Sequence, residues 1–208
     1  LLMIQRILLA SILCLCLLPG KSFPVQAMPP LPSSFYGTLT VNGSHVPAGL
    51  PVSAWINEVQ YALSSSLLAE TGSFYAISIP GDDPATPQIE GGVANDLITF
   101  KIENLVADQT GLWQSGSNLA LNLTATGSTL NISSEHGSVQ KNPAMTYYLP
   151  GEEVTITAMP DPGWNFTGWS GDLVSSQNPA TLSILQNTSL TANYESTGFW
   201  IFLPLITH

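Results

Sequence analysis

The chain has 208 residues, with fourteen acidic and only four basic side chains, so its formal net charge at pH 7 is −10. A field of this sign repels the phosphates of nucleic acids and anionic lipid headgroups, which excludes both as expected partners. Both cysteines, Cys14 and Cys16, lie in the first 27 residues. Removal of that segment would leave a chain without disulfides, thiolate zinc sites or cysteine nucleophiles.

Residues 1–27 have the layout of a secretory signal peptide. The cation Arg6 precedes an apolar run, Ile7–Leu18, and Val25-Gln26-Ala27 forms a small-x-small cleavage signal. The run is shorter than the roughly 20 apolar residues that a membrane-spanning helix needs, which leaves an uncleaved anchor as the weaker alternative. We therefore expect export, cleavage after Ala27, and a secreted or cell-surface protein whose mature chain has no membrane-spanning segment.

A proline-rich spacer, 28–34, is followed by short runs in which apolar and polar residues alternate, separated by Gly, Pro and Asn. The runs are FYGTLTV (35–41), PVSAWI (51–56), GSFYAISIP (72–80), DLITFKIE (96–103) and NLALNLT (118–124). Alternation with period two is typical of half-buried strands. Residues 58–70 have a composition that also allows a helix, but we interpret them as a strand and hairpin. The sequence therefore predicts an all-β fold, with an antiparallel β-sandwich module over 35–124.

This first module is similar to a known group of exported bacterial domains. The stretches FYGTLTVNGSHVPAGLPVSAWIN (35–57) and SFYAISIPGDD (73–83) resemble the transthyretin-like or carboxypeptidase-regulatory-like β-sandwiches. The resemblance implies an accessory or adhesive module without catalysis.

A linker, 125–128, precedes a second module, 129–194. Its central stretch is YYLPGEEVTITAMPDPGWNFTGWSGD (147–172), and the closing runs are ATLSIL (180–185) and SLTANY (189–194). In this order the segments resemble the divergent internalin B-repeat family of bacterial surface proteins. The resemblance implies a small β-grasp-like module. Separately, no segment has a convincing period of 3.6 residues, so we expect low helix content apart from the signal peptide.

The stretch GWNFTGWSGD (163–172) concentrates aromatic side chains. On a strand, Trp164 and Phe166 share a face, and Gly168 is expected to mark a bulge that turns Trp169 toward them. So small a module has few other aromatic rings for a core, so we expect these rings to be buried. The alternative is an exposed platform for sugar rings.

We find no catalytic pattern and no signature of an organic cofactor. The histidines His45, His136 and His208 are neither at metal-ligand spacing nor beside a nucleophile motif. The adjacent Glu152 and Glu153 would point to opposite faces of a strand, so they cannot act as an acid–base pair, and either is most simply a solvated side chain. We therefore expect a protein that is not an enzyme.

The loop PGDDPATPQIEGGVAND (80–96) is acidic and rich in Pro and Gly. Calcium takes clustered oxygen ligands from such loops, so Asp82, Asp83 and Asp96, with Glu90, are candidate ligands, although the EF-hand spacing is absent. The alternative is a solvated loop.

The chain ends in an apolar tail, 195–208, which we interpret either as a final strand or as a sorting tail. Together these features favour a non-catalytic exported bacterial protein that acts in adhesion or structural display, with an extracellular protein or glycan as its partner. One alternative is a carbohydrate-binding protein with Trp55, Trp113 or Trp164 as an exposed platform. Another is an accessory subunit of an extracellular enzyme.

Overall fold

The computed structural model describes residues 28–198. The predicted signal peptide, 1–27, and residues 199–208 of the apolar tail lie outside the described residues. Within 28–198 the chain folds into sixteen strands without a helix, which confirms the all-β fold class. Residues 28–198 contain no helix that is long and apolar enough to cross a membrane.

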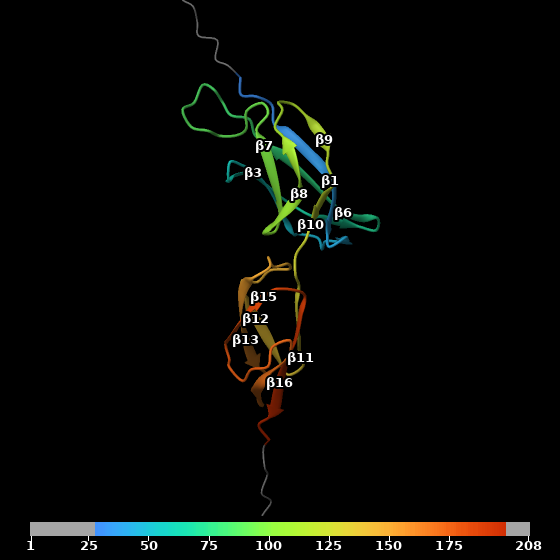
Figure 1. Cartoon of the computed structure of the whole chain (residues 1–208), viewed down its shortest axis with the longest axis vertical. Coiled ribbons are helices and arrows are strands. Elements are labelled where there is room, and N and C mark those ends of the chain that lie inside the picture. Colours follow the sequence, from blue (N-terminus) through green and yellow to red (C-terminus); the bar gives the residue numbers. More distant parts are fainter. Residues whose placement is uncertain (1–27, 199–208) are drawn as a thin grey trace, which may run out of the picture.

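The N-terminal module, our name for strands β1–β10, is a sandwich of two sheets (Figure 1). One sheet has the order β10-β1-β6-β5, with β2 and β9 also paired to β1, and the other has the order β4-β3-β7-β8. The strand bounds are β1 (Ser33–Val41), β2 (Ser44–His45), β3 (Pro51–Ile56), β4 (Val59–Ser65), β5 (Leu67–Ala69), β6 (Gly72–Ile79), β7 (Leu97–Ile102), β8 (Leu105–Leu112), β9 (Asn118–Ala120) and β10 (Leu123–Ala125).

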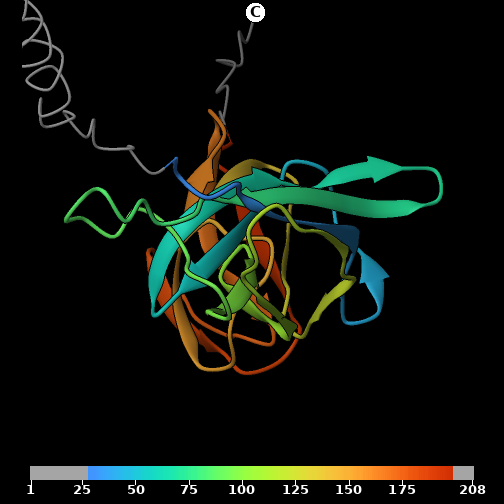
Figure 2. The ribbon, with the colours of Figure 1, turned by 90° about the horizontal axis from the view of Figure 1, so that it is seen from above.

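The period-two pattern places one face of each long strand in the core of this module. Phe100 of β7 is fully buried and packs edge-on against Phe35 of β1, with 5.2 Å between ring centroids. Residues 58–70 form β4 and β5, so the interpretation as a strand and hairpin is confirmed. The hairpin of β5 and β6 projects from the side of the module (Figure 2).

The pairing departs from the antiparallel sandwich that the sequence predicts. Strand β1 pairs in parallel with both β9 and β10. The reason is that the chain leaves β8, crosses to the other sheet and arrives beside β1 running in the same direction. Period two specifies which face of a strand is buried, but it does not specify the direction of the neighbouring strand.

The C-terminal module, our name for β11–β16, has two three-stranded sheets with the orders β11-β16-β14 and β12-β13-β15 (Figure 1). Its first and last strands, β11 and β16, pair in parallel. The strand bounds are β11 (Leu130–Ser134), β12 (Gly137–Asn142), β13 (Glu152–Pro160), β14 (Trp164–Gly171), β15 (Ala180–Ile184) and β16 (Thr188–Ser196). The two modules share no sheet. The module bounds 35–124 and 129–194 stay predictions, because they concern units that fold independently.

The stretch GWNFTGWSGD forms β14 and the turns beside it. The register of β14 against β16 shifts between Phe166 and Gly168, where Gly168 has a φ of 152°, so the predicted bulge is present. Trp169 is consequently turned into the core, is 2 % exposed, and donates its indole N–H to the Gln177 carbonyl at 2.9 Å. Phe166 packs against it, with 4.9 Å between ring centroids. The prediction of core packing is therefore confirmed for Trp169, and Phe166, which is partly buried, packs against the same core.

Trp164 behaves differently from the other two rings. It is half-buried and lies flat against the imidazole of His136, with ring centroids 3.5 Å apart and planes inclined by 4°. Its stack lies outside the buried cluster, so the expectation that this ring belongs to the core is wrong.

We therefore expect the two tryptophans to differ sharply in their effect on stability. Trp169→Ala should lower the free energy of unfolding by about 3–5 kcal/mol, because it empties a packed site and leaves the Gln177 carbonyl unpaired. Trp164→Ala is the matched control and should cost about 1 kcal/mol, the scale of one aromatic stack. Urea denaturation followed by circular dichroism measures the free energy of unfolding of both variants. Equal decreases in the two variants would contradict the division into core and surface rings.

Candidate functional site

The two modules lie end to end (Figure 1). A carboxylate of the N-terminal module accepts hydrogen bonds from the backbone of the C-terminal part of the chain. Glu103, in the turn between β7 and β8, accepts hydrogen bonds from two successive backbone N–H groups. Thr146 N lies 3.0 and 3.2 Å from its two carboxylate oxygens, and Tyr147 N lies 3.0 Å from one of them. Hydrogen bonds to a charged acceptor are stronger than neutral ones, so these contacts couple the modules.

Apolar packing continues the same contact. Tyr147 belongs to the C-terminal part of the chain, yet it is 8 % exposed and packs within the core cluster of the N-terminal module. Burial, followed by the negative charge of Glu103, raises the pKa of the Tyr147 phenol, which keeps it neutral at the junction. The linker contributes Gly127, where a Cβ would lie 2.7 Å from the Leu105 side chain. The junction is therefore closely packed as well as hydrogen-bonded.

A second acidic side chain completes the junction from the other direction. Glu152 Oε2 accepts from the Asn104 side-chain amide and from Leu149 N, each at 2.9 Å. The expectation of a solvated Glu152 is thus wrong, because its strand brings it to the end that faces the N-terminal module. Asn42 adds a reciprocal pair, in which its amide donates to the Gly127 carbonyl at 2.8 Å and its oxygen accepts from Gly127 N at 3.2 Å.

These contacts, which we call the junction clasp (Glu103, Asn104, Tyr147 and Glu152), predict a measurable coupling. Glu103→Ala should lower the free energy of unfolding by about 1–2 kcal/mol, because two backbone N–H groups lose their charged acceptor. Differential scanning calorimetry should also separate one transition into two as the modules uncouple. Glu153→Ala, at an exposed neighbour of Glu152, is the control and should change stability by less than about 0.5 kcal/mol. A single unshifted transition in Glu103→Ala would contradict the clasp.

A different group of polar side chains lies on the outer face of the sheet β4-β3-β7-β8. Trp55 of β3, Glu58 of the following turn, and Thr99 and Lys101 of β7 line a shallow hollow of about 370 Å³. Cross-strand pairing places Trp55 opposite Thr99. The Trp55 indole N–H donates to Ser53 Oγ at 2.7 Å, and the Lys101 ammonium lies 4.0 Å from the centre of the indole ring.

The turn that carries Glu58 has unfavourable backbone geometry. Asn57 and Glu58 have φ angles of 49° and 66°, the pattern of a two-residue hairpin turn in which glycine is preferred at the second position. Glutamate in this left-handed region costs about 1–2 kcal/mol. Glu103 has a similar φ, 57°, but its carboxylate is used in the junction clasp. Among the described residues, the Glu58 carboxylate has no hydrogen bond that would offset the strain.

The other two tryptophans proposed as exposed platforms are positioned differently. Trp113 is 2 % exposed, and its indole N–H donates to the carbonyls of Ile79 and Pro80 at 3.2 and 3.1 Å. The alternative in which Trp113 is an exposed platform is therefore wrong, because Gly92 leaves the space that the ring fills: a Cβ there would lie 2.5 Å from the ring. Trp164 is covered by His136 on one face. Of these three tryptophans, Trp55 is thus the one that lines a hollow together with several polar side chains.

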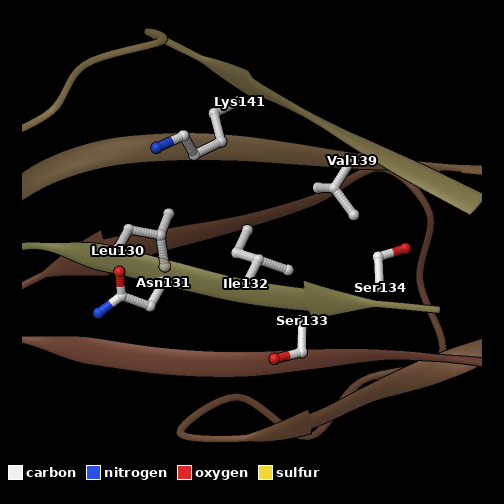
Figure 3. Close-up of a pocket in the computed structure, with 7 residues that line it drawn as sticks. All are labelled: Leu130, Asn131, Ile132, Ser133, Ser134, Val139 and Lys141. Atoms are coloured by element: carbon white, nitrogen blue, oxygen red, sulfur yellow. The ribbon is translucent and has the colours of Figure 1, made fainter.

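The C-terminal module has a groove between the two edge strands β11 and β12. Leu130 and Ile132 of β11 face Val139 of β12 across it, in a space of about 340 Å³ (Figure 3). The ammonium of Lys141, at the rim, donates to the Met145 carbonyl at 3.1 Å. The groove is lined by both polar and apolar side chains, and its one cation, Lys141, already donates a hydrogen bond within the chain.

The predicted calcium ligands lie in the loop between β6 and β7, which projects from the N-terminal module (the green loop in Figures 1 and 2). Each carboxylate accepts a backbone N–H of the loop at 2.9 Å: Asp82 from Glu90, Asp83 from Ala85, and Asp96 from Val93. Within residues 28–198, no three His, Cys, Asp or Glu side chains are gathered as metal ligands would be. The carboxylates stabilise the loop without converging on one point.

Calcium binding by this loop stays a prediction, and a melting experiment decides it. If calcium binds, it should raise the melting temperature relative to a sample with chelator, because a ligand that binds only the folded state stabilises it. The matched variant Asp82→Asn should remove the rise. An unchanged melting temperature in calcium would rule the site out.

Comparison with known proteins bears on the C-terminal module. Residues 128–198 match the family model described as the Divergent InlB B-repeat domain. A search of curated proteins finds no match. A solved structure, "The Bacillus anthracis TIE protein", is 9% identical and aligns over 80% of this chain, and this chain spans 34% of that protein. The TM-score of this alignment is 0.27, which is too low to carry an argument. The match therefore supports the resemblance of residues 128–198 to the divergent internalin B-repeat family, and it does not extend to the transthyretin-like resemblance of the N-terminal module.

Proposed function

We propose that this protein is a non-catalytic, exported bacterial protein of the cell surface or the surrounding medium, and that it acts in adhesion by presenting its N-terminal module. The observation that carries the proposal is the junction clasp. Modules joined only by a flexible linker move freely relative to each other. Here Tyr147 and Glu103 fix the end of one module against the other. Such a junction holds a binding face at a constant orientation.

The family match supports the location. InlB-type repeat domains are typical of bacterial surface and secreted proteins, and the family is typically non-catalytic. The layout of residues 1–27 supports export on independent grounds, since a short apolar run with a small-x-small site is a secretory signal. In this proposal the C-terminal module is a spacer, and ligands are contacted by the N-terminal one.

Fractionation of cells that produce the chain tests the proposal. We expect the protein in the envelope or the medium, with its N-terminus at Met28, and accessible to an antibody against the N-terminal module on intact cells. A variant that lacks residues 2–27 is the control and should stay inside the cell. Recovery of the wild-type chain from the cytoplasm with residues 1–27 still attached would overturn the proposal.

A further inference from the structure

We propose that the hollow formed by Trp55, Glu58, Thr99 and Lys101 is a binding site for a neutral saccharide. The inference rests on the proposed function, for which it supplies the chemical class of ligand. It depends on three independent features of the hollow: a fixed aromatic ring, a mixed set of charges around that ring, and an unexplained strain at Glu58.

The ring of Trp55 is held in place before any ligand arrives. Its indole N–H donates a hydrogen bond to Ser53 Oγ at 2.7 Å, and Ser53 is 5 % exposed. The position and the tilt of the indole ring are therefore constrained. A side chain that is already ordered loses little conformational entropy on binding. The apolar C–H face of a pyranose ring can lie on such a surface, while its hydroxyl groups reach the polar side chains at the rim.

The two opposite charges beside the ring favour a neutral ligand over an ionic one. A cation would meet the Lys101 ammonium, which lies 4.0 Å from the ring centre. An anion would meet the Glu58 carboxylate and a chain whose net charge is −10. A neutral molecule with many hydroxyl groups avoids both conflicts. Glu58 can accept its hydrogen bonds, Lys101 can donate, and Thr99 can do both.

The contact of Lys101 with the ring does not block the site. Cation–π contacts at partly exposed positions are weak, so the flexible lysine can move from the face of the ring to its edge. There it remains a donor for a sugar hydroxyl. The hollow, about 370 Å³, lies at the lower end of the roughly 300–1,000 Å³ found for small-ligand sites. Its size suits one or two sugar residues of a longer chain.

The strain at Glu58 is the strongest sign that its carboxylate has a task besides folding. Glycine would relieve the φ of 66°, so stability alone favours glycine at this position. At Glu103 the similar strain is offset by the hydrogen bonds of the junction clasp. At Glu58 the described residues offer no such bond. Strained backbone at a polar side chain in a hollow is a recurrent property of ligand sites.

Affinity electrophoresis of the mature protein tests the site, in gels that contain xylan, β-1,3-glucan, mannan or starch, together with an array of neutral and acidic glycans. We expect retention by at least one neutral glycan, unaffected by about 0.5 M salt, at which charge attraction is screened. Trp55→Ala, and Thr99→Val as a nearly isosteric second variant, should weaken binding by about tenfold or more. Trp164→Ala is the matched control and should bind as the wild type does.

Two variants of Glu58 separate a binding role from a structural one. Glu58→Gly should raise the melting temperature, because the strain is relieved, while it weakens glycan binding about tenfold. Glu58→Gln should keep the melting temperature and weaken binding less. Equal binding by Glu58→Gly and the wild type would overturn the role of Glu58.

The site as a whole is overturned if the folded protein binds no neutral glycan, if only acidic glycans are retained, or if folded Trp55→Ala and Thr99→Val bind as strongly as the wild type. These results would leave the cellular location untouched, since fractionation measures it without reference to the hollow. Conversely, a cytoplasmic wild-type chain that still binds neutral glycans would overturn the proposed function alone.

Discussion

The arrangement of the two modules depends on one carboxylate, that of Glu103. It receives the backbone N–H groups of Thr146 and Tyr147 at the point where the C-terminal module meets the N-terminal core. Two successive amides that point at one charged acceptor define a direction as well as a distance. The burial of Tyr147 in the N-terminal core excludes water from the same place, which strengthens the electrostatic contact. The hydrogen bonds of Glu103 and the burial of Tyr147 together hold the two modules in one orientation, although the predicted linker between them has four residues. We call this arrangement the fixed joint.

The joint and the proposed saccharide site share a strand. Thr99 and Lys101 lie on β7, and Glu103 follows directly after that strand ends at Ile102. The hollow and the clasp therefore belong to one hydrogen-bonded sheet, and the orientation of the hollow is set relative to the C-terminal module. Under the proposed function, this arrangement keeps the binding face in one direction with respect to the rest of the molecule. The two glutamates with left-handed backbone angles flank this sheet. Glu103 follows β7 and has hydrogen-bond partners, whereas Glu58 lies in the turn after β3 and its carboxylate has none among residues 28–198.

Much of the fold could be predicted from the sequence, because alternation with period two and the turn residues are local signals. The bulge at Gly168 that buries Trp169 followed from the same reasoning. The junction could not be predicted, since Glu103 and Tyr147 are 44 residues apart and no local pattern pairs them. The burial of Trp113 could not be predicted for a similar reason: it follows β8 in an irregular segment, and the space for its ring is created by a distant glycine, Gly92. Strain at Glu58 is likewise visible only in the backbone angles.

A distance measurement between the modules tests the fixed joint most directly. The sequence contains no cysteine after Cys16, so spin labels can be attached at Gln60→Cys and Glu195→Cys, two exposed positions on β4 and β16. Pulsed electron spin resonance should then give one narrow distance distribution for the mature protein, and a broad one once Glu103→Ala is introduced. A broad distribution in the protein with Glu103 intact would contradict the account, because it would show modules that move independently despite the clasp.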